Sequence, residues 1–562
     1  MIRTLVILTV LMLTTASVLA DQSETIAGVP AAEAHRLGEQ MYRNGLLPSG
    51  KPMQALVQMD IPVEGTMFSC QNCHLRSGLG VIEGTIITLP TNGAKLFRTY
   101  RSGAEIDTIP ARRLLAKPFQ GKDLRPAYTD ESLAAALSHG TDPNGREFDW
   151  TMPRYLFNAQ ESEIMVNYLK TLSVEYSPGV DDEALRFATV VAEGVPQADR
   201  DAMLLTLETV VNDRNVQSRN QESRSRKGPF YKQDKFSAYR RTVLDVWELK
   251  GPRETWRDQL TAYYQKAPVF AMLGGIVTGG WSPVHEFCEA YEIPCIFPIT
   301  DLPALNDDDW YTLYFSKGFY QEGEAAARYL HSLNPAENSP IVQVFTDSDE
   351  SRLLAEGFRQ TWKMLDGTLL LDQEVDAKVL NSDLYWKGLS KSYPKAIFAV
   401  WTGPEGVQAV SSIMSEQSNH KAILLSTSLL GEKSTALPEN LRDLVYMTYP
   451  YRLPGQKVAI EKTVRTWLQN HKIPVTNIDI QAKMYFLGWM LTGVTRMMSD
   501  DFYRDYFLDV FDMMHDENYA IANYPRVSFG PGQRYASKGC FVVKLSKGPS
   551  PELVPVSGWV VH

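Results

Sequence analysis

Basic residues are in short supply in this chain. Its 562 residues include 66 Asp and Glu against 56 Lys and Arg, which gives a formal net charge of −10. A protein that binds nucleic acid needs a basic stripe or patch on one face. The charge balance therefore argues against a nucleic-acid partner.

Long apolar runs are absent beyond the N-terminus. After residue 20, no stretch approaches the roughly 18 apolar residues that a membrane-spanning helix needs. The sequence therefore predicts a mature chain without a transmembrane segment.

Familiar nucleotide and calcium motifs are missing as well. The glycine-rich segment 274–280 lacks both the Gly-Lys-Ser/Thr of a phosphate loop and the Gly-x-Gly-x-x-Gly spacing. Residues 307–309 lack the spaced carboxylates of a calcium loop. No nucleophile–base arrangement stands out, so we do not expect an enzyme. Direct oxidation of a bound substrate stays open as the least favoured alternative.

The first twenty residues are typical of a secretory signal peptide. Arg3 gives a positive start, residues 5–13 are apolar, and Val18-Leu19-Ala20 has the small-residue pattern of a cleavage site. We expect export to the periplasm, with residues 1–20 removed. An uncleaved anchor is the alternative.

Cysteine is scarce, and two of the five cysteines stand in Cys70-Gln71-Asn72-Cys73-His74. Cys-x-x-Cys-His is the attachment motif of c-type haem, because two thiols add to the porphyrin and the adjacent His reaches the iron. A zinc site would need two more ligands at similar spacing. We therefore predict one covalent haem c on Cys70 and Cys73, with His74 as an axial iron ligand.

The sixth iron ligand of such a haem is usually Met or His. Met152 precedes Pro153, which disfavours helix at Met152 and places its thioether on a loop. Met165 lies on the apolar face of a predicted helix and is expected to pack in a core. His139 is the rival, which would give bis-His ligation. We predict that His74 and Met152 hold the iron.

Helices are expected on both sides of the haem motif. Leu37 and Met41 share a helical face before it, and Asn158 with Glu161 forms a capping box that begins a final helix. The order of helix, Cys-x-x-Cys-His, Pro-bearing loop, Met-Pro and final helix over residues 30–173 resembles a class I cytochrome c.

That resemblance implies an all-α cytochrome c domain. In the family, a Pro carbonyl holds the proximal His nitrogen, and Pro90 is the matching candidate. Residues 46–67 depart from the pattern, because they lengthen the segment between the first helix and the motif. This insertion is expected either to cover the haem edge or to present a docking surface.

The composition changes after the final helix. Pro178-Gly179 and Asp181-Asp182-Glu183 are typical of a linker, which we place at residues 174–184. From residue 185, short β-branched apolar runs alternate with helical patterns. This alternation predicts βαβ units with parallel sheet, and the length of 185–562 suits two doubly wound lobes.

Three stretches carry a second resemblance. Residues 270–300 end in IPCIFPIT, residues 315–330 are FSKGFYQEGEAAARYL, and residues 340–362 begin PIVQVFTDSDES. With the order of elements over 185–562, they resemble a type I periplasmic binding protein of the leucine/isoleucine/valine-binding class. The resemblance implies a small-molecule ligand between two lobes, at the carboxyl ends of the strands.

By position in that family, the pocket loops follow the strand ends. Thr278 and Thr300 are expected to hold a ligand carboxylate. Several other candidates are aromatic, which suits a flat or apolar ligand, although packing of the inter-lobe surface is the competing interpretation. The candidate cleft residues are Thr278, Gly279, Trp281, Thr300, Asp301, Tyr320, Trp401 and Tyr449, with Asp347, Ser348, Thr402 and Tyr451 in the same loops.

The remaining cysteines are Cys288, Cys295 and Cys540. Cys288 and Cys295 are close in sequence, and exported proteins seldom keep free thiols. We predict a disulfide between them, and a buried thiol at Cys540.

The combined patterns predict a multidomain protein, with an all-α cytochrome c domain followed by an α/β two-lobed binding domain. The main expectation is an exported mono-haem electron carrier for a periplasmic redox partner, whose second domain recognises a ligand or docks a partner. The alternative is a ligand-responsive solute-binding or sensor protein whose haem reports or gates redox exchange.

Overall fold

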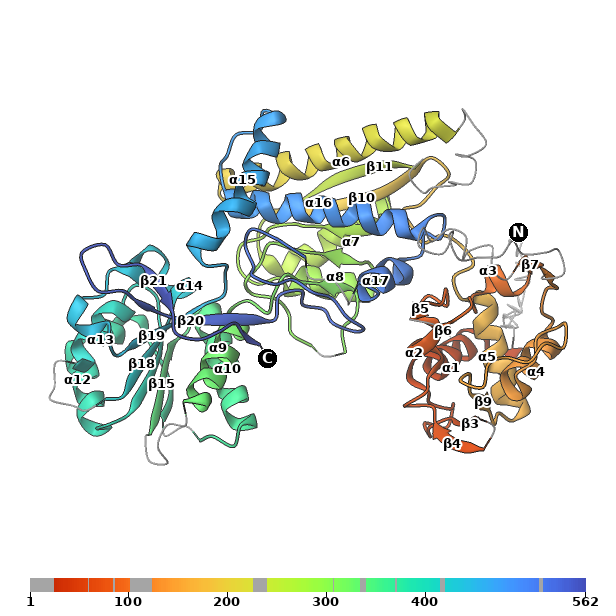
Figure 1. Cartoon of the computed structure of the whole chain (residues 1–562), viewed down its shortest axis with the longest axis horizontal. Coiled ribbons are helices and arrows are strands. Elements are labelled where there is room, and N and C mark those ends of the chain that lie inside the picture. Colours follow the sequence, from red (N-terminus) through yellow and green to blue (C-terminus); the bar gives the residue numbers. More distant parts are fainter. Residues whose placement is uncertain are drawn as a thin grey trace, which may run out of the picture. The chain divides into compact units, whose positions relative to one another are not determined.

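The computed structural model of the chain describes residues 25–561 apart from 59, 84–85, 102–123, 226–239, 307, 334–339, 369–370, 415–419 and 515–518 (Figure 1). Two compact units divide the chain, Met1–Val174 and Glu175–His562. The predicted signal peptide lies outside the described residues. None of the described helices combines the length and the apolar character that a bilayer span requires.

The N-terminal unit is mainly helical. Asn158 caps its last helix by accepting a hydrogen bond from the Glu161 N–H, while the Glu161 carboxylate accepts one from the Asn158 N–H. The helices are α1 (Ala31–Asn44), α2 (Cys70–His74), α3 (Gly93–Leu96), α4 (Asp130–His139) and α5 (Ala159–Thr171).

Helices α1 and α5 cross where a side chain would not fit. A Cβ added to Gly38 would lie 2.4 Å from the Cβ of Tyr168, so the close approach of the two helices requires glycine. The Tyr42 ring packs against Tyr168 with ring centroids 5.5 Å apart. The buried core around this crossing includes Leu37, Met41, Ile164, Met165 and Leu169.

The expectation of an all-α domain is wrong for this unit. Residues within the insertion 46–67 form the hairpin β3 (Gln54–Val57) and β4 (Ile61–Glu64), and β9 (Arg154–Tyr155) pairs with β3. Ala55 and Tyr155 face each other and are buried, so the sheet contributes to the core. Shorter pairs are β1 (Thr25–Ile26) with β2 (Val29–Pro30), β5 (Ile82–Glu83) with β6 (Ile86–Ile87), and β7 (Tyr100–Arg101) with β8 (Leu124–Arg125).

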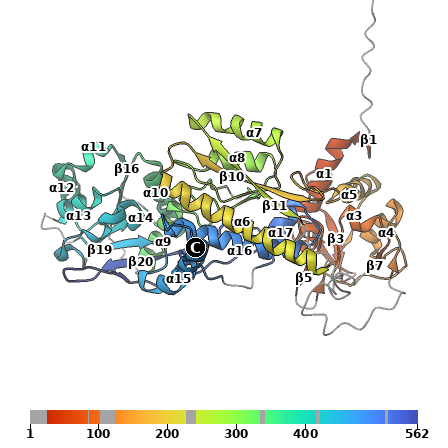
Figure 2. The same cartoon turned by 90° about the horizontal axis from the view of Figure 1, so that it is seen from above.

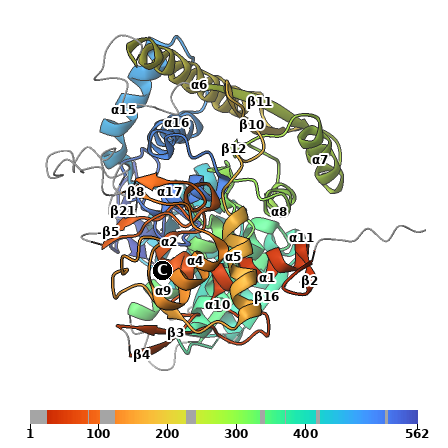
Figure 3. The same cartoon turned by 90° about the vertical axis from the view of Figure 1, so that its right-hand side faces the viewer.

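The C-terminal unit contains two α/β lobes. The first lobe has a parallel sheet in the order β11-β10-β12-β13-β14. Helices cover both of its faces, with α6 and α16 on one side and α7 and α8 on the other (Figure 3). Its elements are β10 (Ala184–Ala192), α6 (Gln197–Ser225), β11 (Arg241–Leu249), α7 (Trp256–Lys266), β12 (Ala271–Leu273), α8 (Ser282–Ala290), β13 (Cys295–Ile296), β14 (Thr312–Leu313), α15 (Pro454–Asn470), α16 (Ile478–Met498) and α17 (Arg504–Asp512).

The second lobe repeats this design. Strands β16-β15-β17-β18-β19 are parallel, and β20 to β22 extend the sheet antiparallel. Helices α9 and α10 cover one face and α12 and α13 the other (Figure 1). The elements are α9 (Phe319–Ser332), β15 (Ile341–Thr346), α10 (Asp349–Met364), β16 (Leu371–Val375), α11 (Ala377–Leu380), α12 (Asp383–Ser392), β17 (Ile397–Trp401), α13 (Gly406–Met414), β18 (Ala422–Ser426), α14 (Thr427–Leu430), β19 (Val445–Tyr449), β20 (Gly539–Leu545), β21 (Leu553–Pro555) and β22 (Val560–Val561).

The chain passes between the two lobes three times, through residues 315–318, 450–453 and 537–538. These segments, with the residues packed against them, are called the lobe junction below. The Ser537 N–H donates to the Phe315 carbonyl oxygen at 2.7 Å, which joins two of the crossings. The Arg452 N–H donates to the Asn523 carbonyl oxygen at 2.7 Å and ties the third crossing to the first lobe.

The predicted disulfide is also wrong in this structure. Cys288 at the end of α8 and Cys295 at the start of β13 are both free thiols buried in one apolar cluster. The Cys288 Sγ lies 3.4 Å from the Met272 sulfur. Burial, together with hydrogen bonding to Cys295, raises the pKa of Cys288 well above its usual range. The two thiols therefore pack as apolar groups in contact, and Cys540 is likewise a buried free thiol.

We predict that Gly357→Ala destabilises the second lobe. Helices α9 and α10 touch at this point, because a Cβ on Gly357 would lie 2.1 Å from the Tyr320 carbonyl oxygen. Overpacking of this kind costs about 1–3 kcal/mol. Gly388 lies on α12 with no atom within 4 Å of an added Cβ, so Gly388→Ala should stabilise by about 0.5–1 kcal/mol. Urea unfolding of both variants tests the pair, and equal midpoints would contradict the close helix crossing.

Candidate functional site

The Cys-x-x-Cys-His motif forms the short helix α2. Cys70 is buried, Cys73 is exposed, and His74 closes the helix. The His74 Nδ1 lies 2.8 Å from the Leu89 carbonyl oxygen. A carbonyl only accepts, so Nδ1 carries the proton and Nε2 keeps its lone pair. The imidazole is thus held in the tautomer that ligates a metal.

The carbonyl that holds His74 belongs to Leu89, and the assignment to Pro90 was wrong by one residue. Proline after Leu89 favours extended backbone at that residue, which presents the Leu89 carbonyl toward the ring. The effect of Pro90 is indirect, because it restricts the backbone of Leu89, whose carbonyl oxygen makes the contact.

Burial also sets the protonation states of this motif. It lowers the pKa of His74 to about 4, although the hydrogen bond to Leu89 acts in the opposite direction. It raises the pKa of the Cys70 thiol to about 12. The imidazole is therefore neutral at pH 7, as a metal ligand must be.

Strand β9 brings the Met152 loop to the motif. The Tyr155 hydroxyl donates to the Phe68 carbonyl oxygen at 2.8 Å and lies 3.9 Å from the Cys70 Sγ. Met152 is half-buried, three residues before Tyr155, in the bend that leads into β9. The set of two thiols and a neutral imidazole fits the chemistry that a c-type haem requires.

The alternative ligands lie elsewhere. His139 is exposed at the end of α4, with its Nδ1 2.9 Å from the Ser138 Oγ. Met165 is fully buried in the core between α1 and α5.

A second polar site lies at the lobe junction, around Lys483. This lysine projects from α16 and is 8% exposed, with its Nζ 5.6 Å from the ring centroids of both Phe315 and Tyr524. Burial alone would lower the pKa of Lys483, but Tyr524 and Asp301 outweigh it and hold the pKa above its usual value. The junction therefore encloses a positive charge against two aromatic rings.

Asp301 and Tyr451 complete the charged surroundings. Asp301 follows β13 and accepts the Phe319 N–H on its carbonyl oxygen at 3.1 Å, which ties the loop to the start of α9. Asp301, together with burial, raises the pKa of Tyr451 well above its usual range. The Tyr451 ring lies 6.0 Å from that of Tyr524.

Glu322 brings a second carboxyl group to the junction, from the first turn of α9. It is 1% exposed and accepts hydrogen bonds from the hydroxyls of Ser426, at 2.8 Å, and Thr448. Burial raises the pKa of Glu322 to about 7, although these hydrogen bonds act to lower it.

Several buried polar atoms near the junction have no hydrogen-bond partner within the described part of the chain. Thr402 and Ser428 stand just beyond the carboxyl ends of the neighbouring strands β17 and β18. The Thr402 Oγ is orphaned, whereas the Ser428 hydroxyl hydrogen-bonds the Glu322 carboxyl and acts to lower its pKa. A buried hydroxyl without a partner costs about 1–3 kcal/mol. Further orphaned atoms are Gln481 Oε1, Asn523 Oδ1 and Ser537 Oγ.

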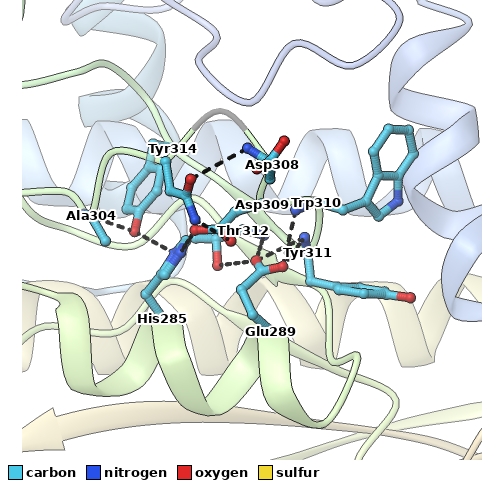
Figure 4. A network of polar contacts seen from close by, with 10 residues as sticks. His285, Glu289, Ala304, Asp308, Asp309, Trp310, Tyr311, Thr312 and Tyr314 are labelled. Atoms are coloured by element: carbon cyan, nitrogen blue, oxygen red, sulfur yellow. Dashed lines mark hydrogen bonds and ion pairs between the residues drawn. The ribbon is translucent and has the colours of Figure 1, made fainter. Parts of the chain in front are cut away.

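A buried network fixes the segment that follows Asp301 (Figure 4). From α8, His285 bonds Asp309 through Nε2 at 2.5 Å and the Tyr314 hydroxyl through Nδ1 at 2.9 Å. The Glu289 carboxylate accepts the N–H groups of Trp310, Tyr311 and Thr312. These bonds position β14 and hence the first crossing between the lobes.

The predicted cleft residues divide into two groups. Asp301 belongs to the junction, and Thr300, whose hydroxyl accepts the Leu302 N–H at 3.0 Å, precedes it. Thr278 and Gly279 are exposed on the loop after β12, and Tyr449 is half-buried beside Tyr451.

Three aromatic predictions are wrong. Trp281 and Trp401 are fully buried in the two lobe cores. The Trp401 Nε1–H donates to the Gln343 side chain at 2.8 Å. Tyr320 faces α10, where its hydroxyl donates to Gln360 at 2.6 Å. Each of the three rings packs within its own lobe, so neither a ligand cleft nor the competing interpretation of inter-lobe packing describes them.

Sequence reasoning missed Glu322, Ser428, Lys483 and Tyr524. Lys483 carried a usable signal, because it is the single charge in the otherwise apolar stretch 480–495. Glu322 carried no such signal, since Glu324 follows it two residues later and the stretch has the composition of an ordinary helix surface.

The junction is distinct from an open groove of about 510 Å³ on the first lobe. Arg465, Gln469, Lys472, Ile473, Pro474 and Val475 line that groove. None of the predicted site residues is among them.

No protein-family model matches the chain, and no curated protein sequence matches it. Solved structures do resemble it. A putative branched-chain amino acid ABC transporter from Rhodospirillum rubrum is 12% identical, with a TM-score of 0.46, over 66% of this chain and 100% of that one. A branched-chain amino acid ABC transporter from Thermus thermophilus with bound valine is 11% identical, with a TM-score of 0.45, over 68% and 97%.

A third such structure is the branched-chain amino acid transporter substrate binding protein of Streptococcus pneumoniae in complex with isoleucine. It is 14% identical, with a TM-score of 0.42, over 66% of this chain and 100% of that one. Likeness at this level carries no information about the ligand of this chain. The two-lobed α/β fold rests on the strand order and register described above.

We predict that Glu322→Gln removes a pH dependence of stability. Between the unfolded pKa of 4.5 and the folded pKa of about 7, the folded chain keeps a proton that the unfolded chain has released. The free energy of unfolding therefore falls as pH rises across this window, by about 3 kcal/mol. The variant should match wild type near pH 5 and exceed its stability at pH 8.

Urea unfolding at a series of pH values measures this difference, with the exposed Glu432→Gln as the matched control. Parallel pH profiles for wild type and Glu322→Gln would show that the carboxyl is ionised in the folded chain.

Proposed function

We propose that this chain is an exported solute-binding protein whose lobe junction holds a small polar ligand, and whose N-terminal unit carries one covalent haem c. The observation that carries the first part is the orphaned buried hydroxyl of Thr402, just beyond the carboxyl end of β17, together with the buried charges of the lobe junction. Doubly wound sheets bind their ligands at the carboxyl ends of the strands.

The chemistry of the junction indicates the kind of ligand. Lys483 offers a positive charge and Asp301 a carboxylate, while the hydroxyls of Thr402 and Ser428 donate or accept. A molecule that carries both charged and hydrogen-bonding groups would pair with all four of these side chains. The crossings at 315–318, 450–453 and 537–538 provide the hinge about which the lobes close on it.

The haem part of the proposal is supported by the thiols of Cys70 and Cys73 and by the fixed tautomer of His74. Met152 is the proposed second axial ligand, and Leu89 orients the first. One-electron exchange is the chemistry that such a group supplies when bound. We propose a periplasmic redox partner protein for this unit, and a haem that reports ligand binding at the junction.

The second candidate function is electron transfer to that partner protein. The two lobes would then serve as a docking scaffold. This candidate rests on the motif alone, whose thiols of Cys70 and Cys73 and imidazole of His74 would hold a group that exchanges one electron. Under this second candidate function, the lobe junction would bind no ligand.

We predict that thermal unfolding of the full chain responds to a small-molecule library of amino acids, organic acids, amines and alcohols. A ligand at one hundred times its dissociation constant stabilises by about 2.7 kcal/mol. Thr402→Val should abolish the shift without lowering the stability of the ligand-free chain, because it removes an unsatisfied hydroxyl. Thr466→Val on the exposed face of α15 is the control. A shift that survives in Thr402→Val would place the ligand elsewhere.

We predict that the exported chain contains one covalent haem, and that Met152→Ala removes the charge-transfer absorption of thioether-ligated ferric haem while covalent attachment persists. Met67→Ala, at a residue that is 72% exposed, should leave the spectrum unchanged. Optical spectra and a pyridine haemochrome assay measure both properties. An unchanged spectrum in Met152→Ala would exclude this residue as the ligand.

A further inference from the structure

A buried arginine on the first lobe has no counter-charge among the residues that the structure describes. Arg214 lies on α6 and is 6% exposed. Its Nε donates to the Thr242 hydroxyl at 2.8 Å, while its Nη2, also buried, has no hydrogen-bond partner among the described residues. Thr242 is a neutral acceptor, so the guanidinium charge is left uncompensated at this contact.

Within the described part of the chain, the charged groups near Arg214 do not supply an anion. Asp213, its neighbour in sequence, pairs with His471 at 3.1 Å. The charge that acts most strongly on Arg214 is that of another arginine, Arg496, on α16. Helices α6 and α16 run side by side (Figure 2), so the two arginines belong to one packed pair of helices.

Other buried arginines of the same unit are compensated. The guanidinium of Arg442 donates to the carbonyl oxygens of Leu437, Ser546 and Gly548, each at 2.9 Å. Arg504 donates to four carbonyl oxygens and to the Tyr264 hydroxyl. A buried charge without such a partner is costly. Arg214 therefore requires a hydrogen-bond acceptor that the described residues do not provide.

We propose that Arg214 and Arg496 bind a small oxyanion of the phosphate or sulfate class. The planar fork of a guanidinium matches two oxygens of such an anion, and the orphaned Nη2 of Arg214 is the donor that it would satisfy. Arg496 is exposed, so the pair meets solvent on its side. The site lies by Thr242, at the amino end of β11, whereas the lobe junction lies at the carboxyl ends of the strands.

Thermal unfolding of the full chain tests this site, in chloride buffer with phosphate or sulfate added at constant ionic strength. Wild type should show a saturable response, with a rise of roughly 1–3 °C for each tenfold step above the dissociation constant. Arg214→Met should lose this response and, without phosphate, be at least as stable as wild type. Arg496→Gln, at an exposed residue, should fold normally and need several-fold more phosphate.

Arg442→Met is the matched control, because it should lower the melting temperature and keep the phosphate response. Destabilisation of Arg214→Met in chloride buffer would overturn the proposal, since it would mean that the chain supplies the counter-charge. An equal phosphate response in Arg214→Met would also overturn it, as a general salt effect. Arg214-dependent binding to phosphatidic acid vesicles, without a response to free phosphate, would identify the same oxyanion chemistry on a lipid headgroup.

Discussion

The buried positive charge of Lys483 is the constraint around which the lobe junction is organised. An ammonium group enclosed by Phe315 and Tyr524 is stable only if other groups compensate it. Asp301 supplies part of this compensation from the loop after β13. The loop is in turn held by the polar network of His285 and Glu289, so the electrostatics of the junction depend on packing inside the first lobe (Figure 4).

The second lobe contributes groups of a different kind. Burial raises the pKa of Glu322 to about 7, and its carboxyl group joins Ser426 and Thr448 in a hydrogen-bonding cluster across α9, β18 and β19. Thr402 adds a hydroxyl that no described group satisfies. In the proposed function, the ligand contacts the charged groups of the first lobe and the hydroxyl groups of the second.

Short sequence patterns predicted the features that depend on residues close together in the chain. The spacing of Cys70, Cys73 and His74 defines the motif, and the alternation of strands and helices gave two α/β lobes. The sequence failed where the outcome depends on three-dimensional packing. Strand β3, within residues 46–67, pairs with β9 (Arg154–Tyr155), so the N-terminal unit is not all-α. Trp281 lies in the loop after β12 and Trp401 is the last residue of β17, but position near the end of a strand does not say whether a ring enters the cleft or the core. Glu322 on α9 and Lys483 on α16 both lie close enough to Asp301 for its charge to shift their pKa values, and the three crossings bring these distant segments together.

Amide hydrogen exchange of the full chain, with and without the first ligand that raises the melting temperature, tests the junction as the binding site most directly. Ligand should slow exchange at residues 402–403, 426–428 and 449–452, and leave α12 on the far face of the second lobe unchanged. Protection confined to the open groove at residues 465–475, or to the N-terminal unit, would contradict the assignment of the ligand to the lobe junction.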